Sequence, residues 1–303
     1  MAGNANVPAR RAAWQRVDGV LLLDKPIGLS SNGALQRARR LLNAAKAGHT
    51  GTLDPLASGL LPLCFGDATK FSQALLDARK AYRALVRFGI ATDTLDGEGA
   101  VVERAPVDFD RESIEAMLPR FVGSIEQVPP RHAALKRDGR PYYEYARANV
   151  EIERTARPVT IDALTLVSWS PPEATIDVTC SKGTYVRVLA DDLGRALGSC
   201  AHLAGLRRTA TGGFGIEDAI TLAALEALDP PDRLARLLPV DAPLADLPAV
   251  TLDAEAAAAL SHGRRPPDNA PPGRYRGYGP AGFVGLIEAT GAELRPVRLI
   301  GAT

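Results

Sequence analysis

Residues 82–88 read YRALVRF, and they indicate which class of fold to expect. Every second residue from Tyr82 to Phe88 is apolar or aromatic, the period of two that is typical of a half-buried strand. The next segment, residues 93–99, reads DTLDGEG and contains an Asp-Gly pair that favours a hairpin turn into residues 100–102. A strand followed by a hairpin predicts antiparallel pairing, and hence an α+β fold rather than a doubly wound parallel one.

Other segments extend this prediction to a mainly antiparallel sheet with flanking helices. An apolar run that ends at Pro26 predicts a strand, and residues 48–59 are expected to form a loop. The further elements are a strand at 19–25, strands at 159–168 and 175–180, helices that follow caps at Ser30 and Asp67, a helix near 111–121, and a helix after the turn at 181–183.

The chain of 303 residues is long enough for two domains. Prolines cluster between residues 228 and 248, which predicts a boundary between a main domain at 17–244 and a smaller one at 245–303. The smaller region holds short strand-like pieces that suit a small β-barrel. Residues 1–16 are small, polar and basic, and we expect them to be a disordered extension.

Composition excludes several classes of protein. Lys and Arg number 36 against 35 Asp and Glu, so the net charge of +1 argues against a strongly basic nucleic-acid binder. Three cysteines without a C-x-x-C pair predict neither a zinc ribbon nor a disulfide framework, and no metal site is expected. The longest apolar run, Leu60–Phe65, is too short to span a membrane, so we expect a soluble cytoplasmic protein.

Local charge differs from the total. Residues 25–53 contain five Lys or Arg and no acidic residue, and residues 131–147 contain five more with only two acidic residues. Three tyrosines lie within the second stretch. Basic residues with aromatic residues between them suit a phosphate backbone with unstacked bases, although a solvated helix face and an ordinary loop are the plainer interpretations.

Residues 47–62, AGHTGTLDPLASGLLP, form the most unusual segment of the chain. Its glycines and prolines predict a shaped loop, and Asp54 lies between the apolar residues Leu53 and Pro55. Asp54 could accept backbone N–H bonds in a structural turn. Alternatively, it could act as a nucleophile or base in a partly dry site.

The motifs of this sequence resemble those of the bacterial tRNA pseudouridine synthase family TruB. The resemblance runs from about residue 18 to residue 225, and more weakly through the C-terminal region. The motifs that carry it are LLDKP at 22–26, GHTGTLDP at 48–55, KAY at 80–82, SKGTYVR at 181–187 and LRRT at 206–209.

The resemblance implies a cofactor-independent isomerase that converts uridine 55 in the T-loop of tRNA to pseudouridine after base flipping. It implies that Asp54 is the catalytic aspartate, that Arg187 pairs with it, and that Tyr185 assists proton transfer. It leaves open whether Asp54 attacks C1′ of the ribose, attacks C6 of the base, or promotes a glycal intermediate.

The resemblance also implies a set of substrate-binding residues. Tyr82 would stack on the flipped base, Leu206 would line the uracil pocket, and His49 would meet T-loop nucleotides that flip with the target. Lys25 would support the active-site loop. For Tyr82 and Leu206 the plainer interpretation is ordinary core packing, and for His49 it is an exposed polar position.

The implied partner is tRNA, bound at its T-arm by a monomeric enzyme. Residues 129–157 would form an RNA-contacting insertion, and 245–303 a PUA-like RNA-binding domain that reaches the acceptor stem. The residues expected to bind RNA are Arg37, Arg40, Lys136, Arg140, Arg207, Arg208 and Arg264.

The sequence departs from the family pattern at two places. His132-Ala133 stands where the family commonly has Tyr-Ser, and Gly212-Gly213-Phe214 replaces the usual Gly-Pro-Phe. Because neither change touches Asp54, we expect activity to be retained. The rival hypotheses are a non-catalytic tRNA-binding or tRNA-folding protein and a pseudouridine synthase for another RNA.

Overall fold

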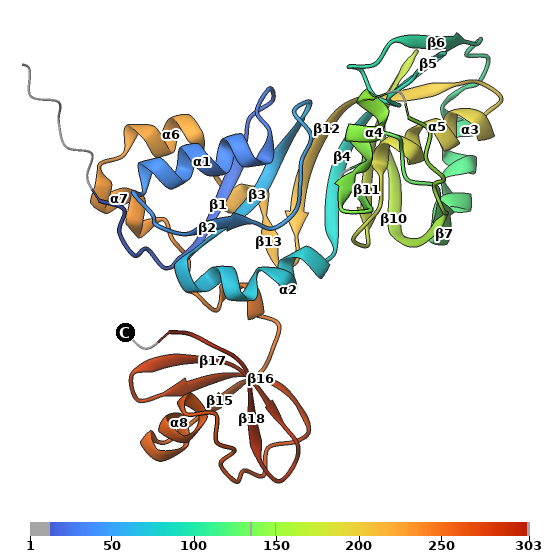
Figure 1. The fold of residues 1–303 in the computed structure, drawn as a ribbon. Helices are drawn as coiled ribbons and strands as arrows, with labels where there is room; N and C mark the ends of the chain where they lie inside the picture. Colours follow the sequence, from blue (N-terminus) through green and yellow to red (C-terminus); the bar gives the residue numbers. More distant parts are fainter. Residues whose placement is uncertain (1–12, 134, 149, 302–303) are drawn as a thin grey trace, which may run out of the picture.

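The computed structural model describes residues 13–133, 135–148 and 150–301. A large sheet with helices on it forms the main body, and a smaller sheet lies below it, beyond helix α2 (Ser72–Asp77) (Figure 1). No helix among these residues is long and apolar enough to cross a membrane. The α+β class predicted from the strand and hairpin pattern is confirmed.

The main sheet follows the strand order β14-β1-β3-β12-β4-β11-β10-β7, with β2 beside β3 and β13 beside β12. Its ladders are antiparallel except for β1–β14 and β3–β12, which are parallel. The strands are β1 (Gly19–Lys25), β2 (Ala47–His49), β3 (Ala57–Phe65), β4 (Lys80–Phe88), β7 (Gly123–Gln127), β10 (Arg157–Ser170), β11 (Glu173–Cys180), β12 (Ala201–Thr211), β13 (Phe214–Gly215) and β14 (Ile220–Thr221).

Two central strands were not predicted, β3 and β12. Pro62 lies within β3, although proline cannot donate to a ladder. In the structure β3 pairs with β12 only over Ala57–Gly59 and with β2 only over Leu63–Phe65. Pro62 lies in the gap between these two ladders, so its missing N–H costs the sheet little.

Helices flank both halves of the sheet. Helix α1 packs against α6 beside β1 and β3, while α3 packs against β10 and α5 against β12. Ser30 caps α1 as predicted, because its side chain accepts the N–H of Gly33 at 3.0 Å. The bounds are α1 (Ser31–Leu41), α2 (Ser72–Asp77), α3 (Arg111–Met117), α5 (Val186–Ala196), α6 (Leu222–Ala227) and α7 (Pro230–Ala235), with 3₁₀ turns η1 (Gly66–Phe71), η2 (Leu118–Phe121), η3 (Ile216–Asp218) and η4 (Ala242–Leu244).

The predicted cap at Asp67 is wrong. The segment begins as the 3₁₀ turn η1, and α2 starts only at Ser72 without a side-chain cap. The Asp67 carboxylate instead pairs with Lys70 at 2.8 Å and with Arg16 at 3.0 Å. Because these cations hold its side chain, Asp67 is not available to cap a helix.

Two clusters of buried apolar side chains make up most of the core. One lies under β4, β10, β11, β12 and the helices α3 and α5, and the other lies under β1, β3, α1 and α6. Tyr82 and Leu206 pack against both clusters. The junction between the two halves of the sheet therefore runs past these two side chains.

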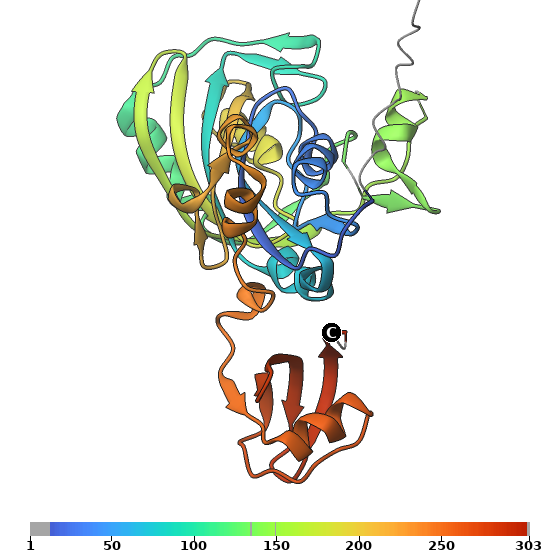
Figure 2. The same cartoon turned by 90° about the vertical axis from the view of Figure 1, so that its left-hand side faces the viewer.

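Two smaller features lie at the edges of the main body. The predicted hairpin is confirmed as β5 (Ile90–Thr92) and β6 (Val101–Arg104). The segment 129–157, light green in Figure 2, projects to one side and contains β8 (Lys136–Arg137), β9 (Arg140–Pro141) and α4 (Tyr142–Arg147).

The C-terminal region has a sheet and a core of its own. The sheet order is β15-β16-β17-β18, and α8 covers a core that includes Leu260 and Ile287. The main body contacts this region through Lys70, whose Nζ donates to the carbonyl of Leu299 at 3.0 Å. The elements are β15 (Ala249–Thr251), α8 (Ala254–Ser261), β16 (Gly273–Gly279), β17 (Gly282–Ala289) and β18 (Leu294–Leu299).

The expected disorder of residues 1–16 falls for the most part outside the described residues. The last of them are ordered by contacts with the end of α1. The N–H of Gln15 donates to the carbonyl of Asn43 at 2.9 Å, and the guanidinium of Arg39 lies 4.5 Å from the centroid of the Trp14 ring.

Candidate active site

The loop that carries Asp54 is held at both ends by hydrogen bonds. At its start, the N–H of Thr50 donates to the carbonyl of Pro62 at 3.2 Å. Beside Asp54, the N–H of Leu53 donates to the Ser31 hydroxyl at 2.7 Å, and Leu53 itself is buried. The N–H of Ala57 donates back to the carbonyl of Asp54 at 3.0 Å. These bonds fix the backbone and leave the Asp54 side chain 42% exposed.

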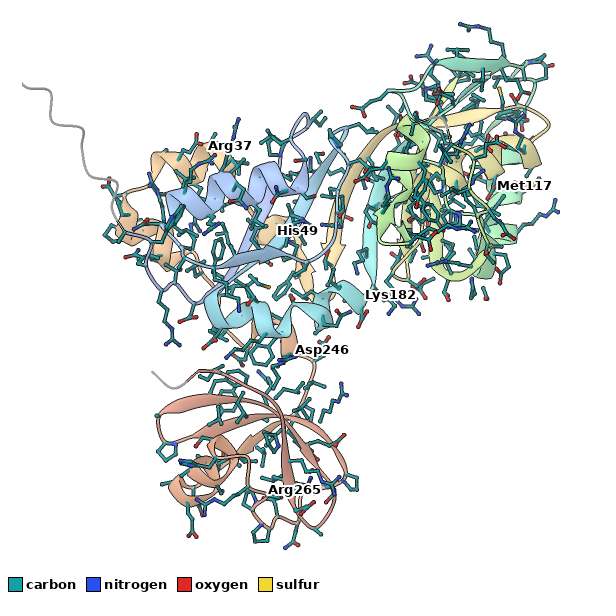
Figure 3. All side chains as sticks on the ribbon, viewed as in Figure 1. Arg37, His49, Met117, Lys182, Asp246 and Arg265 are labelled. Atoms are coloured by element: carbon teal, nitrogen blue, oxygen red, sulfur yellow. The ribbon has the colours of Figure 1, made fainter. Side chains whose placement is uncertain are left out.

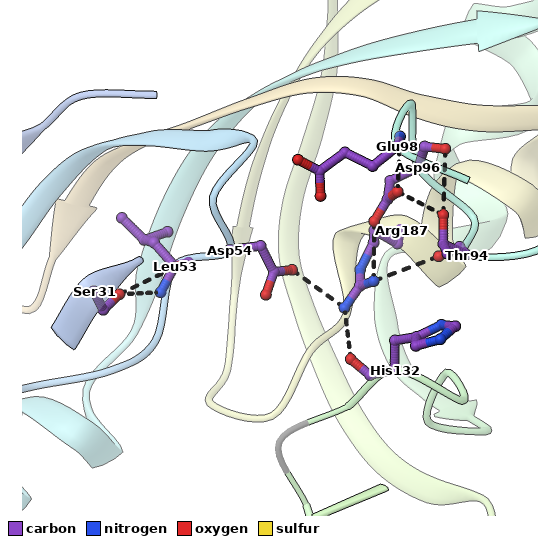
Figure 4. A network of polar contacts seen from close by, with 8 residues as sticks. All are labelled: Ser31, Leu53, Asp54, Thr94, Asp96, Glu98, His132 and Arg187. Atoms are coloured by element: carbon purple, nitrogen blue, oxygen red, sulfur yellow. Dashed lines mark hydrogen bonds and ion pairs between the residues drawn. The ribbon is translucent and has the colours of Figure 1, made fainter. Parts of the chain in front are cut away.

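Arg187 faces this carboxylate from the first turn of α5 (Figure 4). Its Nη2 lies 3.2 Å from Oδ2 of Asp54, and only 8% of its side chain is exposed. The guanidinium also donates at 3.4 Å to the carbonyls of Thr94 and His132. The pairing that the family resemblance implied is therefore present, and a buried, multiply bonded arginine holds the half-exposed carboxylate in place.

Asp96 is the third member of this network, and the sequence analysis missed it. Its Oδ2 accepts Nη1 of Arg187 at 3.0 Å, and only 5% of its side chain is exposed. Its Oδ1 accepts the Thr94 hydroxyl at 2.6 Å and the N–H of Glu98 at 3.1 Å. In the sequence it reads as an ordinary turn aspartate, because the contact with Arg187 spans 91 positions and has no local signature.

A pocket of about 290 Å³ opens over Asp54. Its walls come from the loop at 51–54, from β4 and β12, and from the turn between β11 and α5. Tyr82, Tyr185 and Leu206 all line it, as the resemblance implied. Burial raises the pKa of both phenols above their ordinary value, so both stay protonated at neutral pH. The pocket thus surrounds one carboxylate with aromatic and apolar walls and with four cationic side chains, Lys80, Lys182, Arg187 and Arg208.

Lys25 and His49 lie outside the residues that line the pocket. Lys25 is fully buried at the end of β1, where its Nζ donates to the carbonyls of Leu29 at 2.6 Å and Pro26 at 3.0 Å. Burial lowers the pKa of Lys25 to about 8, although the charge of Asp54 acts in the opposite direction. These contacts lie in the segment before α1, and the expected support of the active-site loop by Lys25 stays a prediction.

His49 lies on β2 (Figure 3). Its Nδ1 is buried and has no hydrogen-bond partner among the described residues. Burial, and next the charge of Arg208, lower the pKa of the imidazole. The lowered pKa favours the neutral imidazole at neutral pH.

Most of the basic residues expected to bind RNA are exposed. Arg37 and Arg40 lie on α1, and Arg264 follows α8. Lys136 lies in β8, and Arg140 in β9 pairs with Glu144 at 3.5 Å. They therefore occupy three separate regions of the molecule.

Arg207 and Arg208 are placed differently. Arg207 forms a bidentate pair with Asp24, at 3.1 and 2.8 Å. Arg208 is only 1% exposed and lines the pocket, so it lies apart from the exposed basic residues, and its expected RNA contact stays a prediction. Successive strand residues point to opposite faces of the sheet, which is why these neighbours differ.

Within the described residues, no group of three or more His, Cys, Asp or Glu side chains could hold a metal ion. The three cysteines are buried and free. The site therefore consists of one carboxylate in a buried arginine–aspartate network, with tyrosine and leucine walls.

Comparison with known proteins gives consistent matches. The N-terminal domain of the TruB family of pseudouridylate synthases matches residues 39–186, and the C-terminal domain of tRNA pseudouridylate synthase B matches residues 187–245. A tRNA pseudouridine synthase B of Thiobacillus denitrificans is 58% identical over 96% of this chain and 98% of its own length. Its counterpart in Dechloromonas aromatica is 53% identical over 96% of this chain and 98% of its own length.

Solved structures agree with these matches. A chain from a Cbf5-Nop10-Gar1 complex superposes with a TM-score of 0.72 at 26% identity, covering 93% of this chain and 85% of its own. A chain from an H/ACA RNP bound to a substrate RNA gives a TM-score of 0.71 at 25% identity, covering 94% of this chain and 85% of its own. The likeness extends over nearly the whole chain described above.

Proposed function

We propose that this chain, which belongs to the TruB family of pseudouridylate synthases, isomerises uridine to pseudouridine in tRNA. One observation supports the proposal above all others. Asp54 lies 3.2 Å from the buried guanidinium of Arg187, at the mouth of a pocket walled by Tyr82, Tyr185 and Leu206. A single positioned carboxylate in an aromatic and apolar pocket suits covalent or general-base work on one flipped base.

The reaction breaks the N1–C1′ bond of uridine and forms a C5–C1′ bond. The proton on C5 is lost, and N1 gains one, so no external electron donor or acceptor is needed. Asp54 would act on the flipped nucleotide while Tyr82 stacks on its base. Tyr185, protonated at neutral pH, is available to pass a proton during the isomerisation.

The proposal extends to the RNA partner. We propose that the target is uridine 55 in the T-loop, and that the projecting segment 129–157 contacts the T-arm. In that segment the Arg140 guanidinium lies 5.0 Å from the centroid of the Tyr145 ring, a pair suited to a phosphate and a base. The C-terminal sheet, with Arg264 exposed, would reach the acceptor stem. The chain would work as a monomer in the cytoplasm.

Release of tritium from tRNA labelled at C5 of uridine tests this function. We expect release from a tRNA with uridine at position 55, and none from a matched transcript with cytidine there. No release from either would leave a non-catalytic tRNA-binding protein. Equal release from both would identify a synthase for another uridine.

A further inference from the structure

Arg208 occupies the middle of the sheet that forms the floor of the pocket. In the strand register it lies opposite Gly59 of β3 on one side and Tyr82 of β4 on the other. Side chains directly opposite each other on antiparallel strands share a face, so Arg208 and Tyr82 point the same way. Both line the pocket above this face.

The guanidinium of Arg208 connects separate parts of the site. Its Nε donates to the carbonyl of Leu60 at 2.6 Å, and its Nη2 reaches the carbonyl of Gly51, three residues before Asp54, at 3.5 Å. Tyr82 lies directly opposite Arg208 in the strand register, and the charge of Arg208 opposes the rise that burial causes in the pKa of Tyr82. One side chain thus bonds to the loop that bears Asp54 and lies beside the aromatic ring expected to meet the base.

Arg208 holds this place without a carboxylate partner. Among the described residues, no Asp or Glu oxygen lies within ion-pair distance of its guanidinium, although the residue is only 1% exposed. A buried cation is costly unless hydrogen bonds compensate it. The hydrogen bonds to Gly51 in the loop and to Leu60 in β3 are therefore the interactions that hold the guanidinium in place. A side chain without the planar guanidinium could not make both bonds together.

Gly59 makes the close approach of β3 to Arg208 possible. A Cβ on Gly59, where φ is +101°, would lie 2.2 Å from the carbonyl oxygen of Arg208. The backbone of β3 is therefore fitted closely against this arginine. Gly51, whose carbonyl accepts from Arg208, has a φ of +123°, a backbone conformation that favours glycine.

We propose that Arg208 is a positioning residue, which fixes Tyr82 and the loop bearing Asp54 relative to each other so that the base and the carboxylate meet in one geometry. The proposal rests on the proposed function, because it assigns Arg208 a part in that reaction. Arg208 acts through these two neighbours and does not itself hold the RNA.

The experiment compares Arg208→Met and Arg208→Lys with a matched control, Arg83→Met. Arg83 lies next to Tyr82 on the opposite face of the sheet, where it pairs with Asp177 at 2.8 Å. Loss of positioning on the scale of 1 Å predicts a fall of about 100-fold in the single-turnover rate for Arg208→Met. We expect a smaller fall for Arg208→Lys, a rate within about twofold of wild type for the control, and tRNA affinity within about threefold for all three variants.

A double-mutant cycle with Tyr82→Phe shows whether Arg208 acts through Tyr82. Removing the hydroxyl first should shrink the effect of Arg208→Met to below about tenfold, because residues directly opposite each other on neighbouring strands couple. An undiminished effect accompanied by equally weakened tRNA binding would overturn the proposal, since Arg208 would then hold the RNA itself. Wild-type rates for Arg208→Lys and Tyr82→Phe would also overturn it.

Hydrogen exchange supplies a readout that needs no turnover. The amides of residues 50–56 should exchange faster in Arg208→Lys than in wild type. Their exchange rate should be the same in Arg83→Met as in wild type. Unchanged exchange in Arg208→Lys would overturn the proposal even if the variants cannot be assayed. Absence of tritium release from the wild-type chain would instead refute the proposed function, so the two failures are distinguishable.

Discussion

Replacing Asp96 by Asn removes one charge from the buried network and leaves no good orientation for the new amide. One carboxylate oxygen accepts Nη1 of Arg187 at 3.0 Å, and the other accepts the N–H of Glu98 at 3.1 Å. Both are obligate donors, so the amide NH₂ must face a donor whichever way the side chain is turned. Either arrangement displaces the guanidinium that holds Asp54.

The structure gives a magnitude for both stability and rate. Removing one partner of a buried ion pair costs about 3–5 kcal/mol in the free energy of unfolding. We expect about 3 kcal/mol, at the lower end of that range, because Arg187 keeps Asp54 as a second partner. Movement of Arg187 on the scale of 1 Å predicts a fall of about 100-fold in the rate of isomerisation.

Urea denaturation and single-turnover tritium release at saturating enzyme measure the two effects separately. The matched control is Asp177→Asn, which removes an exposed aspartate paired with Arg83 and should change stability by less than about 1 kcal/mol. A wild-type rate in Asp96→Asn, with stability lowered as expected, would refute the view that the network positions Asp54.

Three further predictions concern other parts of the chain. Burial lowers the pKa of Lys80 to about 8, so above that pH the unfolded chain binds more protons than the folded one. The free energy of unfolding of wild type, measured relative to Lys80→Met by denaturation, should therefore rise between pH 7 and 9.5. A decline over this range would contradict the prediction. Burial alone would raise the pKa of Asp67, but hydrogen bonds from Lys70 and Gly301 and the charges of Lys70 and Arg16 lower it overall. The stability advantage of wild type over Asp67→Asn should therefore shrink as pH falls from 6 to 3. A constant advantage would refute this prediction. Arg264→Met should reduce the salt slope of tRNA binding by about 1 without changing the single-turnover rate, and an unchanged slope would remove Arg264 from the RNA surface.

Local patterns predicted the elements whose signals lie within a few residues. The alternation of Tyr82, Ala84, Val86 and Phe88 marks one face of β4, and three of these four residues are buried. The Asp-Gly turn gave the hairpin of β5 and β6, and the Ser30 cap gave the start of α1. In each case the interaction that forms the element is local, so the sequence carries it directly.

The central pairing and part of the site depend on distant partners. Strand β3 was missed, and it contains Pro62, whose missing N–H is harmless only because it lies between the ladders with β12 and β2. Asp96 has the sequence context of a turn residue, and its ion pair with Arg187 forms only in the folded chain. Arg208 was expected to bind RNA, and its position on β12 leaves the side chain buried. Sequence alone cannot supply these contacts, because they depend on which strands lie side by side.

The role of Asp54 is tested most directly by single turnover of Asp54→Asn with tRNA already bound. Affinity and rate are measured separately, by filter binding and by tritium release from the saturated complex. We expect tRNA affinity within about threefold of wild type, because Asp54 lies at the pocket and not on the basic surfaces. No isomerisation should be detectable over times in which the wild-type complex reacts fully. Turnover by Asp54→Asn at a rate near that of wild type would contradict the assignment of Asp54 as the catalytic residue.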